Sequence, residues 1–210
     1  MARARAARTF TKGTRTRQRI VEQAAVLFNT RGVAGASIAD VSLATGLEKG
    51  GVYNHFETKE ALALAAFDYA AKLVQEAIDA AVEREAQPLE KLYAVIDVFR
   101  RVSGKPFIAG GCPLLNAAVD ADDTNPPLRA RVCRAMDRFR GLVGGLVRDA
   151  VAAGQLPPVD VDAVTDGTIA TLEGGVMLGK LYGSPVHPKR AADHVTTHLR
   201  LLAARRTGAR

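Results

Sequence analysis

Apolar residues recur along this chain three and four positions apart, which is the spacing of an α-helix with one buried face. The first such run ends in Leu27-Phe28 and predicts a helix that stops at Gly32. We see no β-strand alternation of useful length. Eight further helices are expected at about 38–45, 49–55, 58–83, 88–103, after Pro113, 126–154, 160–182 and from Pro188. The pattern predicts an all-α fold of about nine helices, with a three-helix N-terminal head and a fourth helix that leads into a C-terminal helical core.

Residues 37–56, SIADVSLATGLEKGGVYNHF, read as two short helices joined by a glycine turn. Ser37 is a favourable N-cap with Asp40 in the first turn, and Gly46 is expected to end the first helix in the left-handed conformation. In the second helix Val52 and Phe56, four apart, face inward together. The outward rows carry Lys49, Gly50, Tyr53 and Asn54. This surface suits a DNA major groove, although an ordinary solvent-facing helix pair is the alternative.

The charge distribution favours DNA. The first nineteen residues hold seven basic side chains and no acid, while the rest of the chain carries 22 of each sign, so the whole excess of +7 lies at this end. A polyanion partner explains the asymmetry. A membrane-surface patch, a transit peptide and a solvated tail are the alternatives. The arm lacks the apolar core of a signal peptide, and it runs directly into the first predicted helix.

The run from Arg17 to Phe67 resembles the N-terminal domain of TetR/AcrR-type bacterial transcriptional regulators. The shared features, in order, are Leu27-Phe28, Arg31-Gly32, Ser37 to Val41, Gly46, Lys49-Gly50, Val52-Tyr53, His55-Phe56 and Lys59 to Leu62. The resemblance implies a basic arm over 1–13, a helix-turn-helix domain over 14–60 and an effector-binding and dimerisation domain over 61–210. It further implies a homodimeric repressor in the bacterial cytoplasm, associated with the nucleoid, that binds a palindromic operator and is released by a small hydrophobic molecule.

The same resemblance implies a set of DNA contacts on the second helix of the motif and its flanks. These residues are Arg15, Arg17, Ser37, Lys49, Gly50, Gly51, Tyr53, Asn54, His55 and Lys59. Two departures from the family pattern concern this helix. Glu48 stands where many members have Ser or Thr, and Gly51 follows Gly50. We therefore expect a weakly formed reading helix, since each glycine costs about 1 kcal/mol relative to alanine.

The last two predicted helices are the candidates for dimerisation, because Gly174, Gly175 and Gly179 allow close helix approach. The expected interface consists of Leu172, Gly175, Val176, Gly179, Val195, Leu199 and Leu202. The alternative is that these glycines pack inside the monomer. An effector pocket is expected among aromatic and flexible residues of the central segments, which are otherwise plain core. Its candidates are Tyr93, Phe99, Phe107, Asn116, Met136, Phe139 and Met177.

Other chemistry receives less support from the sequence. No glycine-rich loop follows a strand and no nucleophile lies in a recognised setting, so we expect no enzyme and no cofactor. His194 and His198 suit a polar pair better than a metal site, and no apolar run reaches the length of a membrane span. Two cysteines indicate a reducing compartment, with buried structural roles expected for Cys112 and Cys133. A thiol-redox sensor using Cys112 or Cys133, or a DNA-binding protein without an effector, remains the alternative. Asp120, Asp122 and Asp123 are expected to cap a helix entry.

Overall fold

The computed structural model describes residues 11–102, 104, 106–121 and 125–205. Over these residues the chain forms nine α-helices and no strand, as the sequence pattern predicted. In chain order the helices are α1 (Lys12–Gly35), α2 (Ile38–Thr45), α3 (Lys49–Tyr53), α4 (Lys59–Val82), α5 (Pro88–Arg101), α6 (Pro113–Ala121), α7 (Pro126–Ala152), α8 (Val161–Tyr182) and α9 (Val186–Arg205).

The helix ends follow local capping chemistry. Thr58 and Asp160 cap α4 and α8 by accepting hydrogen bonds from backbone N–H groups three residues on. At Gly32 the backbone of α1 leaves the helical conformation, with φ 75° and ψ 162°, and helical geometry resumes for one further turn. The predicted stop at Gly32 is therefore a break within α1. Helix α3 is shorter than expected and ends at Tyr53, while α9 begins at Val186, before Pro188.

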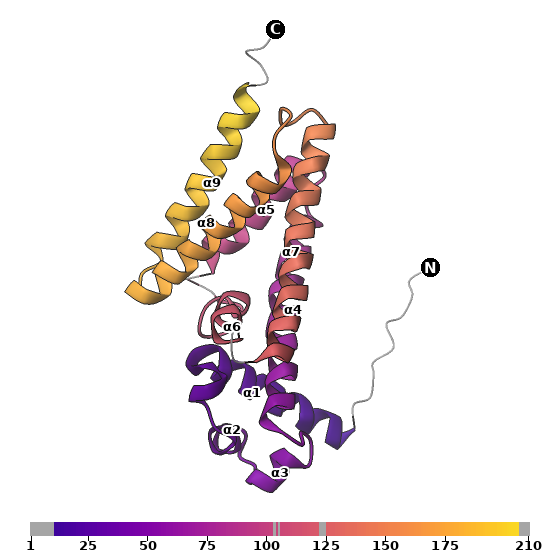
Figure 1. Cartoon of the computed structure of the whole chain (residues 1–210), viewed down its shortest axis with the longest axis vertical. Helices are drawn as coiled ribbons and strands as arrows, with labels where there is room; N and C mark the ends of the chain where they lie inside the picture. Colours follow the sequence, from indigo (N-terminus) through magenta and orange to yellow (C-terminus); the bar gives the residue numbers. More distant parts are fainter. Residues whose placement is uncertain (1–10, 103, 105, 122–124, 206–210) are drawn as a thin grey trace.

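The described part of the chain has two hydrophobic cores, one in the head and one in the body. Helices α1, α2 and α3 lie together at one end of the molecule, and α4 runs from them into the body beside α7 (Figure 1). The early turns of α4 bury Leu62, Ala66 and Ala70 in the head core, and its later turns bury Val74 and Ile78 in the body core. The change from one core to the other therefore occurs within α4, about ten residues beyond the predicted boundary at 60.

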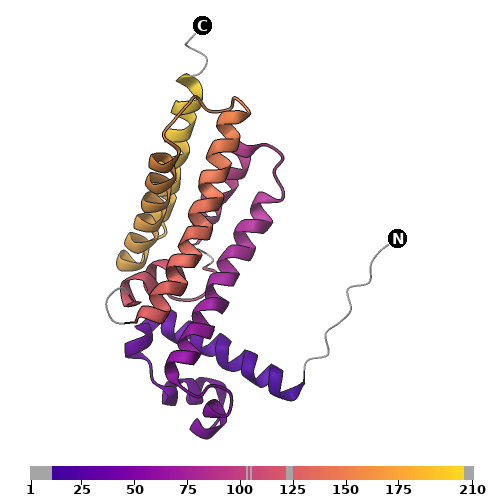
Figure 2. The same cartoon turned by 45° about the vertical axis from the view of Figure 1, so that its right-hand side comes forward.

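Helices α8 and α9 pack side by side along the flank of the body away from α4 (Figure 2). Helix α6 lies between the head and the body and contacts α1, α4 and α7. It is preceded by a loop whose Ile108 packs into the head core. No described helix is both long enough and apolar enough to cross a bilayer.

Candidate functional site

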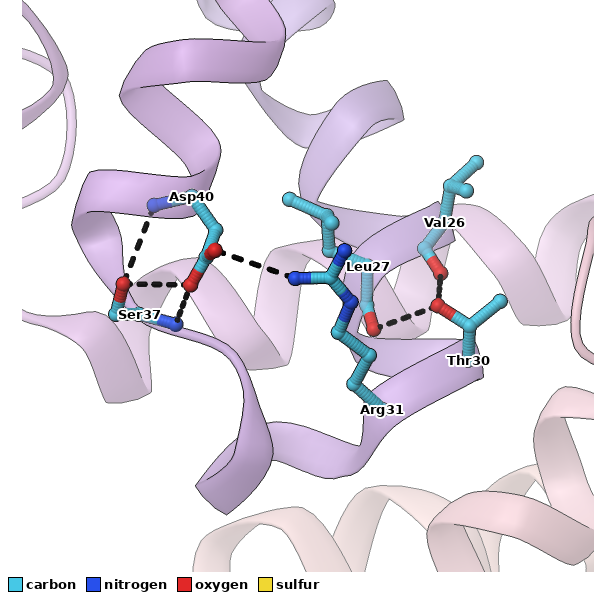
Figure 3. Close-up of polar contacts among 6 residues, drawn as sticks. All are labelled: Val26, Leu27, Thr30, Arg31, Ser37 and Asp40. Atoms are coloured by element: carbon cyan, nitrogen blue, oxygen red, sulfur yellow. Dashed lines mark hydrogen bonds and ion pairs between the residues drawn. The ribbon is translucent and has the colours of Figure 1, made fainter.

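Helix α2 begins with the capping box that the sequence predicted. The Ser37 hydroxyl accepts a bond from the Asp40 backbone N–H at 3.2 Å, and the Asp40 carboxylate accepts from the Ser37 N–H at 2.7 Å (Figure 3). Asp40 also forms an ion pair with Arg31 of α1 at 3.2 Å. The hydrogen bonds from Ser37, together with the charge of Arg31, lower the pKa of Asp40. The ionised carboxylate therefore ties the start of α2 to the end of α1.

The turn between α2 and α3 has the predicted geometry. Gly46 adopts φ 66° and ψ 24°, the left-handed conformation, and its N–H donates to the carbonyl oxygen of Leu43. Val52 is fully buried and Phe56 nearly so, which confirms the inward face. Glu48 precedes α3 without forming a side-chain cap, as its departure from the family pattern led us to expect. Only five residues form this helix, and packing through its inward face holds it in place.

The residues predicted to contact DNA come from α3 and from the starts of α1, α2 and α4. Tyr53 is 47% exposed, and Lys49, Gly50 and Asn54 are exposed beside it, whereas Gly51, His55 and Lys59 are half-buried. Ser37 is exposed but engages its hydroxyl in the cap. Arg15 and Arg17 are exposed on the first turns of α1. No DNA is present, so the contacts themselves stay predictions.

Arg17 has a structural role that the sequence did not reveal. Its guanidinium lies 4.5 Å from the centroid of the Phe56 ring, a cation–π contact that joins the start of α1 to the end of the reading motif. The seven basic residues of the first nineteen are divided by the structure. Residues 1–10 lie outside the described residues, while Lys12, Arg15, Arg17 and Arg19 belong to α1, which overlaps the last two positions of the predicted arm, 1–13.

A polar network joins the head to the body. Asn29 of α1 is buried, and its amide donates to the carbonyl oxygens of Ala109 and Gly111 at 2.7 and 3.1 Å. The Asn116 amide of α6 donates to the side-chain and backbone oxygens of Asn29 at 2.9 and 3.1 Å. Lys180 of α8 in turn donates to Asn116 at 3.2 Å. These bonds form a connection from the head through α6 to α8.

Two glycines with positive φ, Gly110 and Gly32, allow close packing at the same junction. A Cβ on Gly110, whose φ is 103°, would lie 2.5 Å from the Asn29 carbonyl oxygen. Asp120 of α6 accepts a bond from the backbone N–H of Val33 at 2.8 Å, where the break at Gly32 frees this group from the helix. The predicted role of Asp120 at a helix entry is therefore corrected. It binds the interrupted end of α1, whereas Asn125 caps α7, and residues 122 and 123 lie outside the described residues.

A cavity of about 850 Å³ occupies the junction between head and body. Its walls come from α1, α4, α6 and α8, with single contributions from the residues around them. They include Phe28, Asn29, Val33, Ala63, Ala66, Phe67, Leu115, Asn116, Asp120, Leu128, Val176, Met177, Lys180 and Leu181. The lining is mainly apolar with a few polar groups, which is typical of small-molecule sites.

The structure does not bring the predicted pocket residues into one site. Asn116 and Met177 line the junction cavity, and Phe139 lines a second, smaller cavity. Phe99 stacks on Phe139 with ring centroids 5.6 Å apart in the body core. The other three, Tyr93, Phe107 and Met136, pack against that core and line neither cavity. The spacing of aromatic residues in amphipathic helices identifies core positions. It does not show which of those residues line the same cavity, because that depends on tertiary packing.

Most of the residues predicted for the dimer interface are buried within the monomer. Leu172, Val176, Val195 and Leu199 are buried within the monomer, and Leu202 is half-buried against the same core. A Cβ on Gly175 would lie 2.5 Å from the Ala191 Cβ, so this glycine allows α8 to approach α9 of the same chain. Gly179 is buried as well. Within the monomer, this stripe packs against α9 and the body core.

The outer face of α8 and α9 carries a different set of apolar side chains. Tyr182 is 66% exposed at the end of α8, with Met177, Leu178 and Leu181 exposed in the same last turns, and Leu201 is 61% exposed near the far end of α9. An added Cβ on Gly174 meets nothing within 4 Å. We call this surface, Gly174, Leu178, Tyr182 and Leu201, the α8–α9 outer face.

The two cysteines have different surroundings. Cys112 is buried, and burial together with the neighbouring Glu173 carboxylate raises the pKa of its thiol well above 9.0, which disfavours the thiolate. Cys133 is exposed on α7, so the expected buried role is wrong for this residue. Its neighbour Arg131 forms an ion pair with Asp68. His194 and His198 are exposed on α9.

Comparisons with known proteins agree with this architecture. Residues 20–66 match the family of bacterial regulatory proteins of the tetR type, and residues 88–195 match the tetracyclin repressor-like C-terminal domain. A transcriptional regulator of the HTH type from Mycobacterium tuberculosis is 30% identical over 172 residues, which cover 79% of this chain and 84% of that protein.

Solved structures extend the likeness to the whole described fold. A TetR transcriptional regulator from Chloroflexus aurantiacus superposes with a TM-score of 0.87 at 45% identity, covering 90% of this chain and 96% of that one. A TetR-family regulator from Cytophaga hutchinsonii gives a TM-score of 0.80 at 32% identity, covering 94% and 97%. Since the C-terminal match alone spans more than half of the sequence, this chain belongs to the TetR family of DNA-binding transcriptional regulators and is not an enzyme.

Proposed function

We propose that this protein is a ligand-responsive repressor that binds a palindromic operator as a homodimer and is released by a small hydrophobic molecule. The observation that carries the proposal is the position of the 850 Å³ cavity, whose walls belong both to the head helix α1 and to the body helices α6 and α8. A molecule in this cavity touches the two parts whose relative position decides whether the heads fit DNA.

The release step follows from the polar network beside the cavity. Asn29, Asn116 and Lys180 line the cavity and bond to one another, so a ligand that inserts between them competes with the bonds that hold α6 against α1. A ligand shifts the equilibrium only by its difference in affinity for the two arrangements. We infer that the effector prefers the arrangement in which these bonds are broken, and that α4 moves the head with it.

The DNA contacts of the proposed repressor centre on α3. Lys49, Tyr53 and Asn54 reach into the major groove, His55 and Ser37 flank it, and Gly50 and Gly51 let the backbone approach closely. Arg15, Arg17 and Lys59 contact phosphates on either side. Because few side chains on α3 are long enough to read bases, phosphate contacts supply much of the affinity.

The proposed dimer uses the α8–α9 outer face. This surface combines exposed apolar side chains with the open position at Gly174, which lets a second helix approach. A two-fold axis there places two heads on successive major grooves of a palindromic site. The protein is expected to act in the bacterial cytoplasm, on nucleoid DNA.

A binding and release assay tests the proposal. A duplex selected from random DNA by the full chain is labelled, and fluorescence anisotropy measures its binding at fixed salt. Compounds that raise the unfolding temperature, drawn from hydrophobic drugs, quinones, aldehydes and acyl-CoA thioesters, are then added. We expect a palindromic consensus and release by at least one stabilising compound. A non-palindromic consensus, or stabilising ligands that all leave DNA binding unchanged, contradicts the proposal and favours an effector-independent protein.

The sign of regulation needs a separate measurement. A reporter gene placed behind the selected operator is expected to fall in expression when the protein is present and to recover when the effector is added. Higher expression in the presence of the protein identifies an activator instead.

A further inference from the structure

Glu173 is a buried acid with an unsatisfied oxygen. It lies in the middle of α8, and its side chain points into the body, where it is only 7% exposed. Its Oε1 accepts a hydrogen bond from the Cys112 thiol at 3.0 Å. Its Oε2 is buried and has no hydrogen-bond partner among the described residues. A thiol is a weak donor, so the carboxylate is poorly compensated for its removal from water.

The acid lines a cavity separate in position from the one at the head junction. This second cavity has a volume of about 320 Å³ and lies between α4, α7 and α8. Its inner walls are apolar and consist of Ala71, Val74, Ile78, Leu114, Ala135 and Phe139. Cys112 lines both cavities, so the Cys112–Glu173 pair stands at the partition between them.

The charged groups around this cavity lie on three elements. Asp68 and Lys72 come from α4, Arg138 from α7 and Glu173 from α8. Asp68 is paired with Arg131, and Lys72 with Glu76 at 3.5 Å. Two of the rim charges are therefore already compensated, and the unsatisfied acid is the innermost charged group.

We propose that this second cavity binds a small lipophilic amine, whose ammonium group donates to Glu173 Oε2 and whose apolar part packs against Phe139, Val74 and Ile78. A charge-assisted N–H donor is the strongest partner for a carboxylate oxygen without one. The aromatic ring of Phe139 adds a favourable surface for the cation and its apolar body. An anionic ligand is repelled, and a neutral alcohol offers the oxygen a weaker bond.

The larger cavity is less suited to an amine. Its buried polar side chains already bond to protein: Asn29 to the 109–111 loop, and Asn116 to Asn29. Asp120 accepts from the Val33 N–H. Among the described residues of its wall, no buried acid has an oxygen without a hydrogen-bond partner. The two cavities therefore differ in the chemistry that they select.

An occupant of the second cavity bridges α8 to α4, the helix that continues into the head. If the protein is the ligand-responsive regulator proposed above, on which this consequence alone rests, an amine is an effector or a co-effector. The binding site itself does not depend on that role. The two are separable by measuring amine binding and operator binding independently.

Isothermal titration calorimetry with a matched set of probes tests the site. Benzylamine and benzyl alcohol have nearly the same shape and differ in charge. We expect benzylamine to bind the full-length protein at least about tenfold more tightly than benzyl alcohol, with Glu173→Gln reducing the amine affinity by at least about tenfold and leaving the alcohol unchanged. Glu85→Gln, which removes an exposed acid beyond the end of α4, is the control and is expected to bind like the wild type.

A second readout does not depend on the variant. Cation binding at Glu173 favours its ionised form, so benzylamine binding is expected to release a proton near pH 6 and to tighten between pH 6 and pH 8. Titrations in buffers of different ionisation enthalpy measure this release. Equal affinity for both probes, unchanged amine binding in Glu173→Gln, or binding without proton release overturns the site.

Operator binding separates this inference from the proposed function. If benzylamine binds and operator affinity is unchanged, the amine site stands but the amine is not an effector. If a hydrophobic compound releases the operator but the protein binds no amine, the proposed function stands and the amine site is overturned.

Discussion

Gly50 and Gly51 are neighbours in α3 but meet different surroundings. A Cβ on Gly50 points into open space on the exposed side of the reading helix, whereas one on Gly51 would lie 3.5 Å from the Leu47 Cβ, an ordinary packing distance. Neither glycine has a positive φ, so alanine fits both positions in the free protein. Any penalty for a side chain at Gly50 therefore arises from DNA rather than from the fold.

Replacing each glycine by alanine tests this distinction. We expect Gly50→Ala and Gly51→Ala each to stabilise the chain by up to about 1 kcal/mol, because alanine favours the helix. Gly50→Ala is expected to weaken operator binding about tenfold, since its methyl group stands between backbone and DNA, while Gly51→Ala binds nearly as well as the wild type. Thermal unfolding and fluorescence anisotropy measure the two effects. Equal losses of affinity in both variants would count against close backbone approach at Gly50.

Glu173 gives stability a pH dependence. Burial raises its pKa from 4.5 to about 7, and the hydrogen bond from Cys112 partly opposes the rise. Between these values the folded chain holds a proton that the unfolded chain has released, so stability falls as the pH rises from about 4.5 to about 7 and then levels off. The loss is about 3 kcal/mol for a shift of this size.

The variant Glu173→Gln has no proton to lose. We expect its advantage in free energy of unfolding over the wild type to be smallest near pH 5 and to grow with pH, by up to about 3 kcal/mol at pH 8. Urea unfolding at pH 5, 6, 7 and 8 measures the difference. A gap between the two proteins that does not change with pH would show that the acid is ionised throughout.

At the scale of helices, local signals predicted more than long-range ones. Ser37, Asp160 and Gly46 mark helix ends through bonds to residues three or four away, and these ends were predicted correctly. The bond between Asn29 and Asn116 spans 87 positions, and nothing in the spacing of either residue indicates the other. The junction between head and body was therefore invisible in the sequence, although Asn116 itself was singled out.

The junction can be tested through the same two helices. We expect Asn116→Ala to lower the free energy of unfolding by about 1–3 kcal/mol. The change leaves polar groups of α1 and of the loop before α6 without their hydrogen-bond partner. Operator affinity is expected to fall as well, since α6 no longer holds the head. Lys180→Met removes only the exposed end of the network and is expected to change stability by less than about 1 kcal/mol. Chemical denaturation and anisotropy compare the variants, and an Asn116→Ala protein with wild-type affinity would contradict the coupling.

For the whole molecule, the position of the dimer surface depends on which stripe of α8 remains exposed. Hydrophobic periodicity identified Leu172 and Gly175 but not their partner, since the same stripe suits a neighbouring helix or a second copy. Packing against α9 uses that stripe within one chain. The exposed apolar side chains that we propose for a partner include Tyr182 and Leu201, which the sequence-based assignment did not include.

Leu201→Glu is the sharpest test of that surface. The side chain is 61% exposed in the monomer, so the change is expected to leave the fold intact while placing a charge in the proposed interface. We expect sedimentation to show a dimer for the wild type and a monomer of 22.3 kDa for the variant. Operator affinity is expected to fall at least about tenfold, because one head alone contacts a half-site. Val119→Glu puts the same charge on an exposed apolar position of α6 and is expected to remain dimeric. If Leu201→Glu stays a dimer with full affinity, the two copies meet through another surface, and the exposed apolar side chains of α8 and α9 serve a different partner.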